Sequence, residues 1–362
     1  MPDTTSWAPR HHVIVAGGAG FIGSAFARNY LRWHPDAGVT VLDKLTYAGN
    51  TDNLSQVWDD PRFCFVQADI CDYDAVAPHI AGADAVVNFA AETHVDRSIL
   101  DPDVFVRTNV LGMNTLLRAA KDGWITSGAA NARDAGGYEG KRFLHVSTDE
   151  VYGHVGEGAT AEDAPLKPRN PYSASKAGAE LIAFSYFTNF GLPVLVTRGE
   201  NTIGPYQYPE KATPLFITNA IEDKPLPIYG QGKAVRHYVY VDDHAAAIDL
   251  VLHEGTPGEA YNIGADEEVN TVELARAIVG LLGKPESLMQ LVPDRPGHDY
   301  RYNLDFSKVL RLGWKPEYNF ERTIAATVDW YARNEPWWRK IKAGDYKDYY
   351  QRQYGARLAS VR

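Results

Sequence analysis

Short apolar runs alternate with amphipathic stretches through the first half of the chain. The apolar runs have the length of β-strands and cover His12–Ala16, Val39–Asp43, Phe63–Asp69, Ala85–Ala90, Arg142–Ser147 and Pro193–Arg198. Amphipathic stretches with helical spacing are Ser24–Trp33, Val104–Lys121 and Tyr172–Phe190. Repeated strand–helix units build a parallel sheet that is covered on both faces. The pattern therefore predicts an α/β fold with a doubly wound parallel (Rossmann) sheet.

The pattern changes after about Gly199, where Pro and Gly become frequent and the elements become shorter. We expect residues 11–199 to form the sheet domain. Part of 236–262 should return to this domain, because Tyr238–Leu252 again has the pattern of a strand that leads into a helix. Residues 200–340 are expected to form mainly a smaller, mixed α/β lobe that binds the substrate.

Three further segments fall outside this pattern. Residues 1–10 and 341–362 are expected to be tails, and residues 123–140, rich in Gly, Ala and Asn, are expected to be an insertion loop without an assigned role. The start of the chain has no apolar run, which argues against a signal peptide. No stretch approaches the length of an apolar membrane span.

Charge and cysteine content exclude several classes of function. The formal net charge is −10, so the chain lacks the excess of positive charge that is typical of nucleic-acid-binding proteins. Cys64 and Cys71 fit neither a metal-binding spacing nor a disulfide scaffold. We therefore expect a cytoplasmic protein that binds no metal, nucleic acid or membrane. Local arginines and helix N-termini still allow it to bind an anionic small molecule.

The first strand runs into a glycine-rich loop that opens the next helix. Gly17, Gly20 and Gly23 in AGGAGFIGS have the spacing of a dinucleotide-binding fingerprint. Asp43 ends the second strand about 20 residues later, where a carboxylate binds the adenine ribose and repels a 2′-phosphate. This favours NAD over NADP, although the neighbouring Lys44 weakens the preference.

Tyr172 and Lys176 form a Y-x-x-x-K motif, and residues four apart share one face of a helix. We expect the ammonium group to lower the pKa of the phenol, so that Tyr172 takes a proton from a substrate hydroxyl as hydride leaves the same carbon. Lys176 would also hold the nicotinamide ribose. The predicted cofactor-binding residues are Gly17, Gly20, Phe21, Ile22, Gly23, Asp43, Lys44, Thr46, Gly49, Asp69, Ile70, Ala90, Ala91, Thr93, Tyr172 and Lys176.

The stretch STDEVYG, from Ser147 to Gly153, places two adjacent carboxylates, Asp149 and Glu150, at the end of a buried strand. Burying a charge is costly unless the group is paired or its pKa shifts. One interpretation is a turn or a helix cap, and the other is an acid–base pair. Adjacent residues on a regular strand point to opposite faces, so the pair can serve one substrate only if the chain turns there.

Taken together, these motifs resemble the extended short-chain dehydrogenase/reductase family and, within it, the dTDP-glucose 4,6-dehydratase group. The resemblance runs from about Val13 to about Trp338 and rests on GGAGFIGS, LDKLTYAGN, AAETHVDRSI, STDEVYG, PYSASKAGAE, GPYQYPEK, RHYVYVDDH, YNIG and DRPGHD. It implies a lyase that uses NAD to convert an NDP-glucose, with dTDP-glucose as the first expected substrate, to the 4-keto-6-deoxy sugar. It also implies a homodimer that pairs Val104–Lys121 and Tyr172–Phe190 of each subunit.

The resemblance also implies a role for each residue of the site. Tyr172 would deprotonate the sugar 4-hydroxyl, with Thr148 bonded to the same oxygen. Glu150 would remove the C5 proton while a protonated Asp149 donates to the departing 6-hydroxyl, and hydride would then return to C6. The implied substrate-binding residues are Thr148, Asn201, Lys211, Tyr229, Arg236, Asn262, Arg295 and His298.

The chain departs from the family pattern close to the expected site. Glu200, Thr202 and Ile203 replace residues of a Ser-Asn-Asn-Tyr sequence, and His237 replaces an Asp after Arg236. These changes leave the specificity for base and sugar open. Two alternative functions also remain: a nucleotide-sugar 4-epimerase or related enzyme of the family, which would leave the two acids without a role, and a non-catalytic nucleotide-sugar-binding protein.

Overall fold

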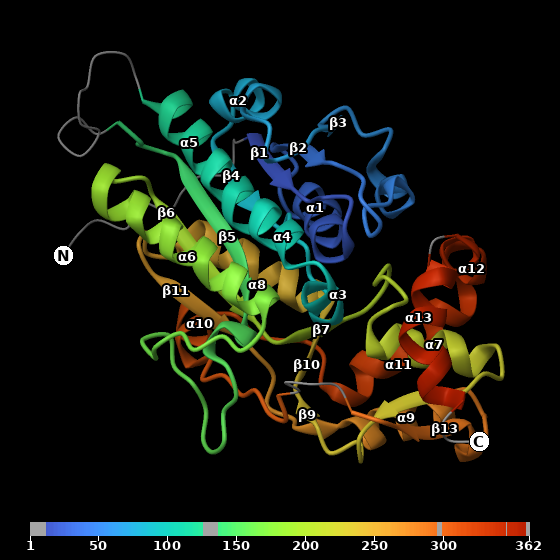
Figure 1. Cartoon of the computed structure of the whole chain (residues 1–362). Coiled ribbons are helices and arrows are strands. Elements are labelled where there is room, and N and C mark those ends of the chain that lie inside the picture. The colour runs from blue at the N-terminus through green and yellow to red at the C-terminus, as the bar shows by residue number, and fades with distance from the viewer. Residues whose placement is uncertain (1–11, 126–136, 295–298, 345, 360–362) are drawn as a thin grey trace.

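A seven-stranded parallel sheet forms the centre of the computed structural model, which describes residues 12–125, 137–294, 299–344 and 346–359 (Figure 1). The strands follow the order β11 (Ala260–Ile263), β6 (Val194–Gly199), β5 (Arg142–Thr148), β4 (Ala85–Asn88), β1 (His12–Ala16), β2 (Gly38–Asp43) and β3 (Phe63–Gln67). The order reverses between β1 and β4, which is where open α/β sheets bind their ligands. The predicted fold class is confirmed.

Helices cover both faces of the sheet, because alternate strand residues point to opposite sides. Val13 and Val15 pack with α1 (Phe21–Trp33) and α8 (Val241–Glu254). Ile14 and Ala16 pack on the other face. The helices of that face are α2 (Tyr73–Ala81), α5 (Met113–Trp124) and α6 (Pro171–Phe190). The near-continuous apolar strands of the sequence are therefore explained by burial on two faces.

Shorter elements connect the strands. The expected helix Val104–Lys121 is divided, because it contains a π-helical segment, η2 (Val106–Gly112), between α4 and α5. The other short elements of the sheet domain are η1 (Thr51–Val57), α3 (Val95–Leu100), α4 (Pro102–Phe105), η4 (Asp149–Tyr152) and α10 (Ser307–Leu312). Of the expected insertion 123–140, residues 126–136 lie outside the described residues.

A second lobe packs at the carboxyl ends of the strands and has its own apolar core (Figure 1). Its strands form three pairs: β7 (Asn201–Ile203) with β10 (Tyr238–Tyr240), β8 (Leu226–Tyr229) with β13 (Met289–Val292), and β9 (Val235–Arg236) with β12 (Val269–Asn270). Its helices are α7 (Ala212–Ile221), α9 (Thr271–Leu281), η5 (Glu286–Leu288), α11 (Phe320–Arg333), α12 (Glu335–Ala343) and α13 (Tyr346–Ala359).

The C-terminal residues differ from expectation. Most of 341–362, expected to be a tail, forms the end of α12 and the whole of α13, and α13 packs against α12 and β13. Tyr354 on α13 is buried in the core of the second lobe. Apolar burial therefore orders this segment despite its high content of polar residues. No helix in the described part of the chain is long and apolar enough to cross a membrane.

Candidate active site

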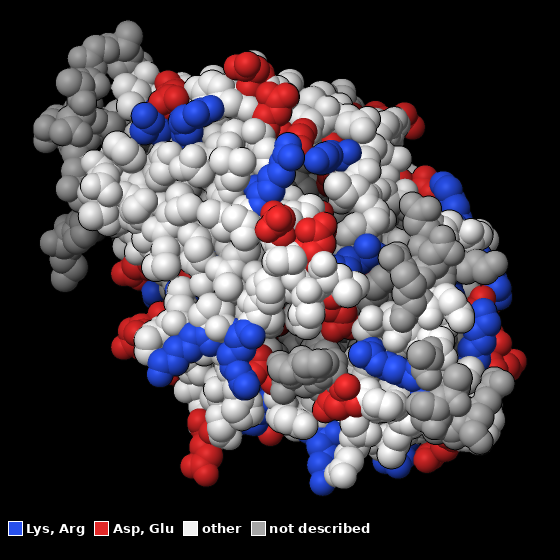
Figure 2. Space-filling model, viewed as in Figure 1, with Lys and Arg blue, Asp and Glu red and all other residues white. Residues whose placement is uncertain are grey.

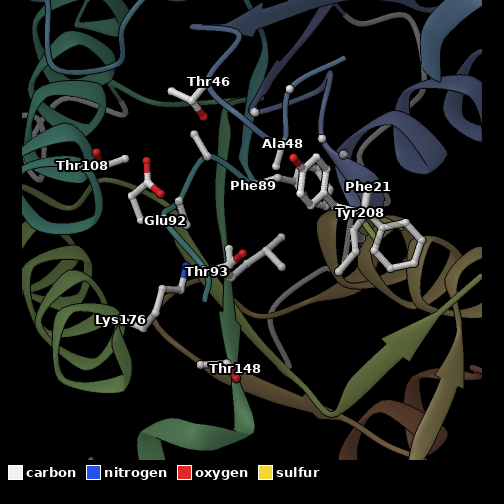
Figure 3. Close-up of a pocket in the computed structure, with 18 of the residues that line it drawn as sticks. Phe21, Thr46, Ala48, Phe89, Glu92, Thr93, Thr108, Thr148, Lys176 and Tyr208 are labelled. Carbon is white, nitrogen blue, oxygen red and sulfur yellow. Dashed lines mark hydrogen bonds between the residues drawn. The ribbon is translucent and has the colours of Figure 1, made fainter. Parts of the chain in front are cut away.

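A cavity opens at the carboxyl ends of the strands, between the sheet and the second lobe (Figure 3). All sixteen predicted cofactor-binding residues line it, and so do all five predicted catalytic residues. Figure 3 shows Glu92 and Thr108 on one side of this space and Phe21 and Tyr208 on the other. Segments that are more than 150 residues apart in the sequence therefore meet at one site.

The glycine loop has the geometry that a bound pyrophosphate requires. Gly17 has a φ of +75°, and a Cβ atom there would lie 2.5 Å from the backbone nitrogen of Ala90. A Cβ atom on Gly23 would lie 2.4 Å from the carbonyl oxygen of Gly17. Only glycine fits at these two positions, and the loop leads directly into α1, whose N-terminal N–H groups favour an anion. The residues present therefore fit a dinucleotide.

The carboxylate of Asp43 lies at the end of β2, as the fingerprint requires. Its Oδ2 accepts a hydrogen bond from Ala19 N at 2.9 Å and its Oδ1 accepts one from Leu45 N at 2.8 Å. Each carboxylate oxygen can accept a second bond, so ribose hydroxyls can still bind here. Lys44 forms an ion pair with Asp69 at 2.7 Å, which leaves its charge less available to a 2′-phosphate. The arrangement favours NAD.

The chain turns at the end of β5, and this turn brings the two acids to one site. Thr148 is the last residue of β5 and caps the 3-10 helix η4, which begins at Asp149. Its Oγ1 accepts a hydrogen bond from Glu150 N at 3.3 Å and donates one to Asp149 Oδ1 at 3.0 Å. Since the strand has ended, side chains no longer alternate between faces. Asp149 and Glu150 both line the cavity.

The environments of the two carboxyl groups differ. Asp149 is buried, and its Oδ2 has no hydrogen-bond partner among the described residues. Burial and the charge of Glu150 raise the pKa of Asp149 to about 7. Glu150 is only half-buried, and its Oε2 accepts a bond from Asn170 Nδ2 at 3.4 Å. The pair therefore has one buried member suited to carry a proton and, beside it, a more exposed carboxyl group.

The Tyr172–Lys176 pair lies as predicted on α6, but the expected electrostatics are wrong for the protein by itself. Burial and the charge of Glu150 raise the pKa of Tyr172. Lys176 donates to Val146 O at 2.6 Å, and burial lowers its pKa to about 8. The interaction with Thr148 opposes the rise at Tyr172. The sequence shows neither the burial of the phenol nor the nearby carboxylates, both of which raise its pKa.

Of the predicted substrate-binding residues, Thr148, Asn201 and Lys211 line the cavity. Lys211 also donates to the carbonyl oxygen of Thr93 at 2.7 Å. Arg236 is outside the lining, with its guanidinium 4.6 Å from the ring centroid of Tyr302 and bonded to backbone carbonyls, but its charge still acts on Asp149.

The other predicted substrate contacts are placed differently. Asn262 is fully buried, and its amide is bonded to Tyr152, Thr160 and Asp305. The amide donors and acceptor of Asn262 therefore bond residues packed around β11 and are not directed to the cavity. The hydroxyl of Tyr229 lies 2.8 Å from Arg357, away from the lining residues. Arg295 and His298 lie outside the described residues.

Several lining residues had no role in the sequence-based prediction. They are Tyr47, Glu92, Thr108, Tyr208, Glu210 and His244. Burial raises the pKa of Glu92, whereas Glu210 forms an ion pair with Arg97 at 2.9 Å. Glu92 is next to the predicted residue Thr93 in the sequence, and Tyr208 belongs to the motif GPYQYPEK. The sequence therefore shows the motifs of both residues, but it does not show that their side chains face the cavity.

The four departures from the family pattern do not all face the cavity. Glu200 and Thr202 line it, while Ile203 is buried and absent from the lining. His237 bonds Ala265 O through Nδ1 at 2.6 Å, also outside the lining. Glu200 is therefore the acidic departure among the lining residues, and its carboxylate accepts hydrogen bonds from Ala265 N and Leu304 N.

Comparison with known proteins identifies the family. The family model described as GDP-mannose 4,6 dehydratase matches residues 14–327. The dTDP-glucose 4,6-dehydratase of Streptomyces niveus is 46% identical over 338 residues, which cover 92% of this chain and 96% of that protein. The low-salt glycan biosynthesis protein Agl12 of Haloferax volcanii is 49% identical over 319 residues, covering 88% of this chain and 98% of Agl12.

Solved structures give the same result. DesIV, a dTDP-glucose 4,6-dehydratase from Streptomyces venezuelae solved with NAD and TYD bound, is 47% identical with a TM-score of 0.84. The match covers 91% of this chain and 100% of DesIV. The resemblance predicted from the motifs is confirmed, and the chain belongs to the nucleotide-sugar 4,6-dehydratases of the extended short-chain dehydrogenase/reductase family.

Proposed function

We propose that the protein is an NAD-dependent hydro-lyase that converts an NDP-glucose, dTDP-glucose first among them, to the NDP-4-keto-6-deoxyglucose. The turn after Thr148 carries this proposal, because it brings Asp149 and Glu150 into the cavity that Tyr172 and Lys176 also line. The naming of the relatives as dTDP-glucose 4,6-dehydratases and the NAD and TYD bound to DesIV support the choice of cofactor and nucleotide.

The glycine loop and Asp43 would hold NAD, which would supply a hydride acceptor for oxidation at C4 and, in its reduced form, a hydride donor for C6. Tyr172 removes the proton of the 4-hydroxyl, and Thr148 positions that oxygen. Oxidation at C4 makes the C5 proton acidic. Glu150 removes it, and Asp149 donates its proton to the leaving 6-hydroxyl so that water departs. A proton then returns to C5 as hydride is added at C6. Asn201 and Lys211 are the described candidates for contact with the rest of the nucleotide sugar.

A product assay tests this function. The protein is incubated with dTDP-, UDP-, CDP- and GDP-glucose, and the molecular mass of each product is measured by mass spectrometry. Dehydration lowers the mass of the sugar nucleotide by one water, whereas 4-epimerisation leaves it unchanged. We expect loss of water with dTDP-glucose. An unchanged mass with interconversion of the 4-epimers would favour the epimerase, and tight binding without turnover of any substrate would favour a binding protein.

An apolar surface on one side of the sheet domain supports the proposal of a homodimer. Figure 2 shows a broad area over α5 and α6 that is poor in charged side chains. Helix α6 and the two elements that pack against it, α3 and η2, expose the apolar side chains of Ile99, Leu100, Val106, Leu111, Leu181 and Phe190. Apolar side chains exposed on neighbouring helices favour association, and a two-fold axis would pair the same helices of both copies. The two cysteines are free thiols, which agrees with the proposed cytoplasmic location.

A further inference from the structure

We propose that the ion pair between Arg97 and Glu210 keeps NAD in the cavity throughout the reaction, because it holds the second lobe against the sheet domain beside the cofactor-binding residues. Arg97 and Glu210 are positioning residues in this role. The inference rests on the proposed function, in which the same cofactor molecule is reduced and reoxidised within one turnover. Its loss between the two hydride transfers would leave the dehydrated sugar without a hydride donor.

The ion pair joins the two lobes of the molecule. Arg97 lies on α3 of the sheet domain, and Glu210 lies in the connection that leads into α7 of the second lobe. Arg97 Nε and Nη2 donate hydrogen bonds to Glu210 Oε2 at 3.0 and 2.9 Å. The side chain of Glu210 is 2% exposed and that of Arg97 is 27% exposed. Removal of one partner is costly at this degree of burial, because the other is left without its counter-charge.

A second hydrogen bond crosses between the lobes next to the ion pair. Lys211 follows Glu210 and donates to Thr93 O at 2.7 Å. Thr93, Glu210 and Lys211 all line the cavity. The segments 92–97 and 208–211 are therefore bonded to each other at two places along the wall of the cavity.

The ion pair also supports an aromatic part of this wall. The guanidinium of Arg97 lies over the ring of Tyr47, 3.9 Å from its centroid. Tyr47 belongs to the segment 46–49, which contains three of the predicted or observed lining residues besides Tyr47 itself. Its ring meets that of Tyr208 edge-on, with centroids 5.4 Å apart. Figure 3 shows Tyr208 on the same side of the cavity as Phe21, which follows the glycine loop. The pair thus holds the second lobe closed at the cofactor-binding part of the cavity.

A general role in joining the lobes is the competing explanation. The lobes also meet where Lys340 pairs with Asp52 at 2.8 Å and where Trp337 Nε1 donates to Asn53 Oδ1 at 3.0 Å. These four residues are outside the cavity lining, and their contacts do not depend on the ion pair. Loss of the ion pair should therefore loosen the cavity wall while the lobes stay joined, so cofactor release is the property to measure.

Retention of NAD by the holoenzyme tests the proposal. Free NAD is removed from the loaded protein by gel filtration, and the NAD that stays bound is measured at increasing times. Arg97→Met keeps the length of the side chain but removes both donated bonds and the charge over Tyr47, so we expect NAD to dissociate about tenfold faster. Glu210→Gln removes the charge of the other partner and should act in the same direction. Arg97→Lys, which keeps a positive charge, should retain NAD for longer than Arg97→Met.

Arg339→Met is the matched control. Arg339 forms ion pairs with Glu222 at 3.2 Å and with Glu335 at 2.8 Å, and its guanidinium lies 4.6 Å from the ring centroid of Trp338. It therefore combines the same two kinds of interaction as Arg97, but all its partners belong to the second lobe. We expect Arg339→Met to retain NAD as the wild type does.

The possible results separate this inference from the proposed function. Faster loss of NAD from Arg97→Met and Glu210→Gln, with product formation restored by added NAD, supports the role of the ion pair. Retention equal to that of the wild type in either variant, equally fast loss from Arg339→Met, or product formation that added NAD does not restore would overturn this inference alone, provided that the wild type forms the 4-keto-6-deoxy product. Absence of that product from the wild type would overturn the proposed function together with it.

Discussion

The hydroxyl of Thr148 bonds both to the side chain of Asp149 and to the backbone of Glu150, so one residue holds the turn that makes the acid pair usable. Thr148→Val should lower kcat by about 10²-fold, because it removes the cap and the contact with the substrate oxygen together. Thr148→Ser keeps the hydroxyl and serves as the control. Steady-state rates of both variants at one pH are the measurement. Equal rates in the Val variant and the wild type would contradict the assigned role.

Glu150→Gln separates oxidation from elimination. The variant should still allow Tyr172 to deprotonate the 4-hydroxyl, but it lacks the base for the C5 proton. We expect bound NADH to accumulate, seen as absorbance near 340 nm (roughly, the reduced-nicotinamide band), with product formation lowered by about 10³-fold. Tyr172→Phe is the matched control, since it should block oxidation and leave no NADH signal. Normal product formation by Glu150→Gln would show that another group is the base.

If the protein is a dimer through this apolar surface, a charged substitution there should lower the mass of the particle in solution. Leu181 on α6 is 63% exposed, and Leu181→Glu places a charge where two helices of the partner would pack. We expect light scattering coupled to size exclusion to give the mass of one chain for this variant and of two chains for the wild type. Leu281→Glu on α9, where Leu281 is 51% exposed, is the control and should leave the mass unchanged.

A histidine–carboxylate cluster far from the cavity predicts a pH-dependent stability. His253 Nδ1 lies 3.2 Å from Asp249 Oδ1, and His34 Nε2 lies 3.0 Å from the same oxygen. Burial alone would lower the pKa of His253, but Asp249 raises it above 6.5. A raised pKa contributes stability that is complete below pH 6.5 and disappears as the pH rises through the folded-state value.

Replacement of this histidine tests that sign. His253→Gln should lower the free energy of unfolding by about 1 kcal/mol near pH 6 and by less near pH 8.5. Urea unfolding at the two pH values measures the difference. A loss that is greater at pH 8.5 would contradict the predicted direction of the pKa shift.

Much of the site followed from sequence because local patterns determine it. The glycine spacing requires backbone approach that larger residues prevent, and at Gly17 and Gly23 the structure shows why. The spacing of Tyr172 and Lys176 places them on one helical face wherever the helix packs. Asn262 shows the limit of such reasoning. It stands in a short motif, but its amide bonds are satisfied in the interior by residues that are distant in the chain.

By itself the sequence determined the doubly wound fold, the dinucleotide loop and the family, because hydrophobic period, glycine spacing and motif order are local properties. Only the tertiary structure decided how the acids of STDEVYG work. It ends the strand at Thr148, buries Asp149 and leaves Glu150 more exposed. Burial and the charges of residues distant in sequence set proton affinity, so no local pattern could assign the acid and the base.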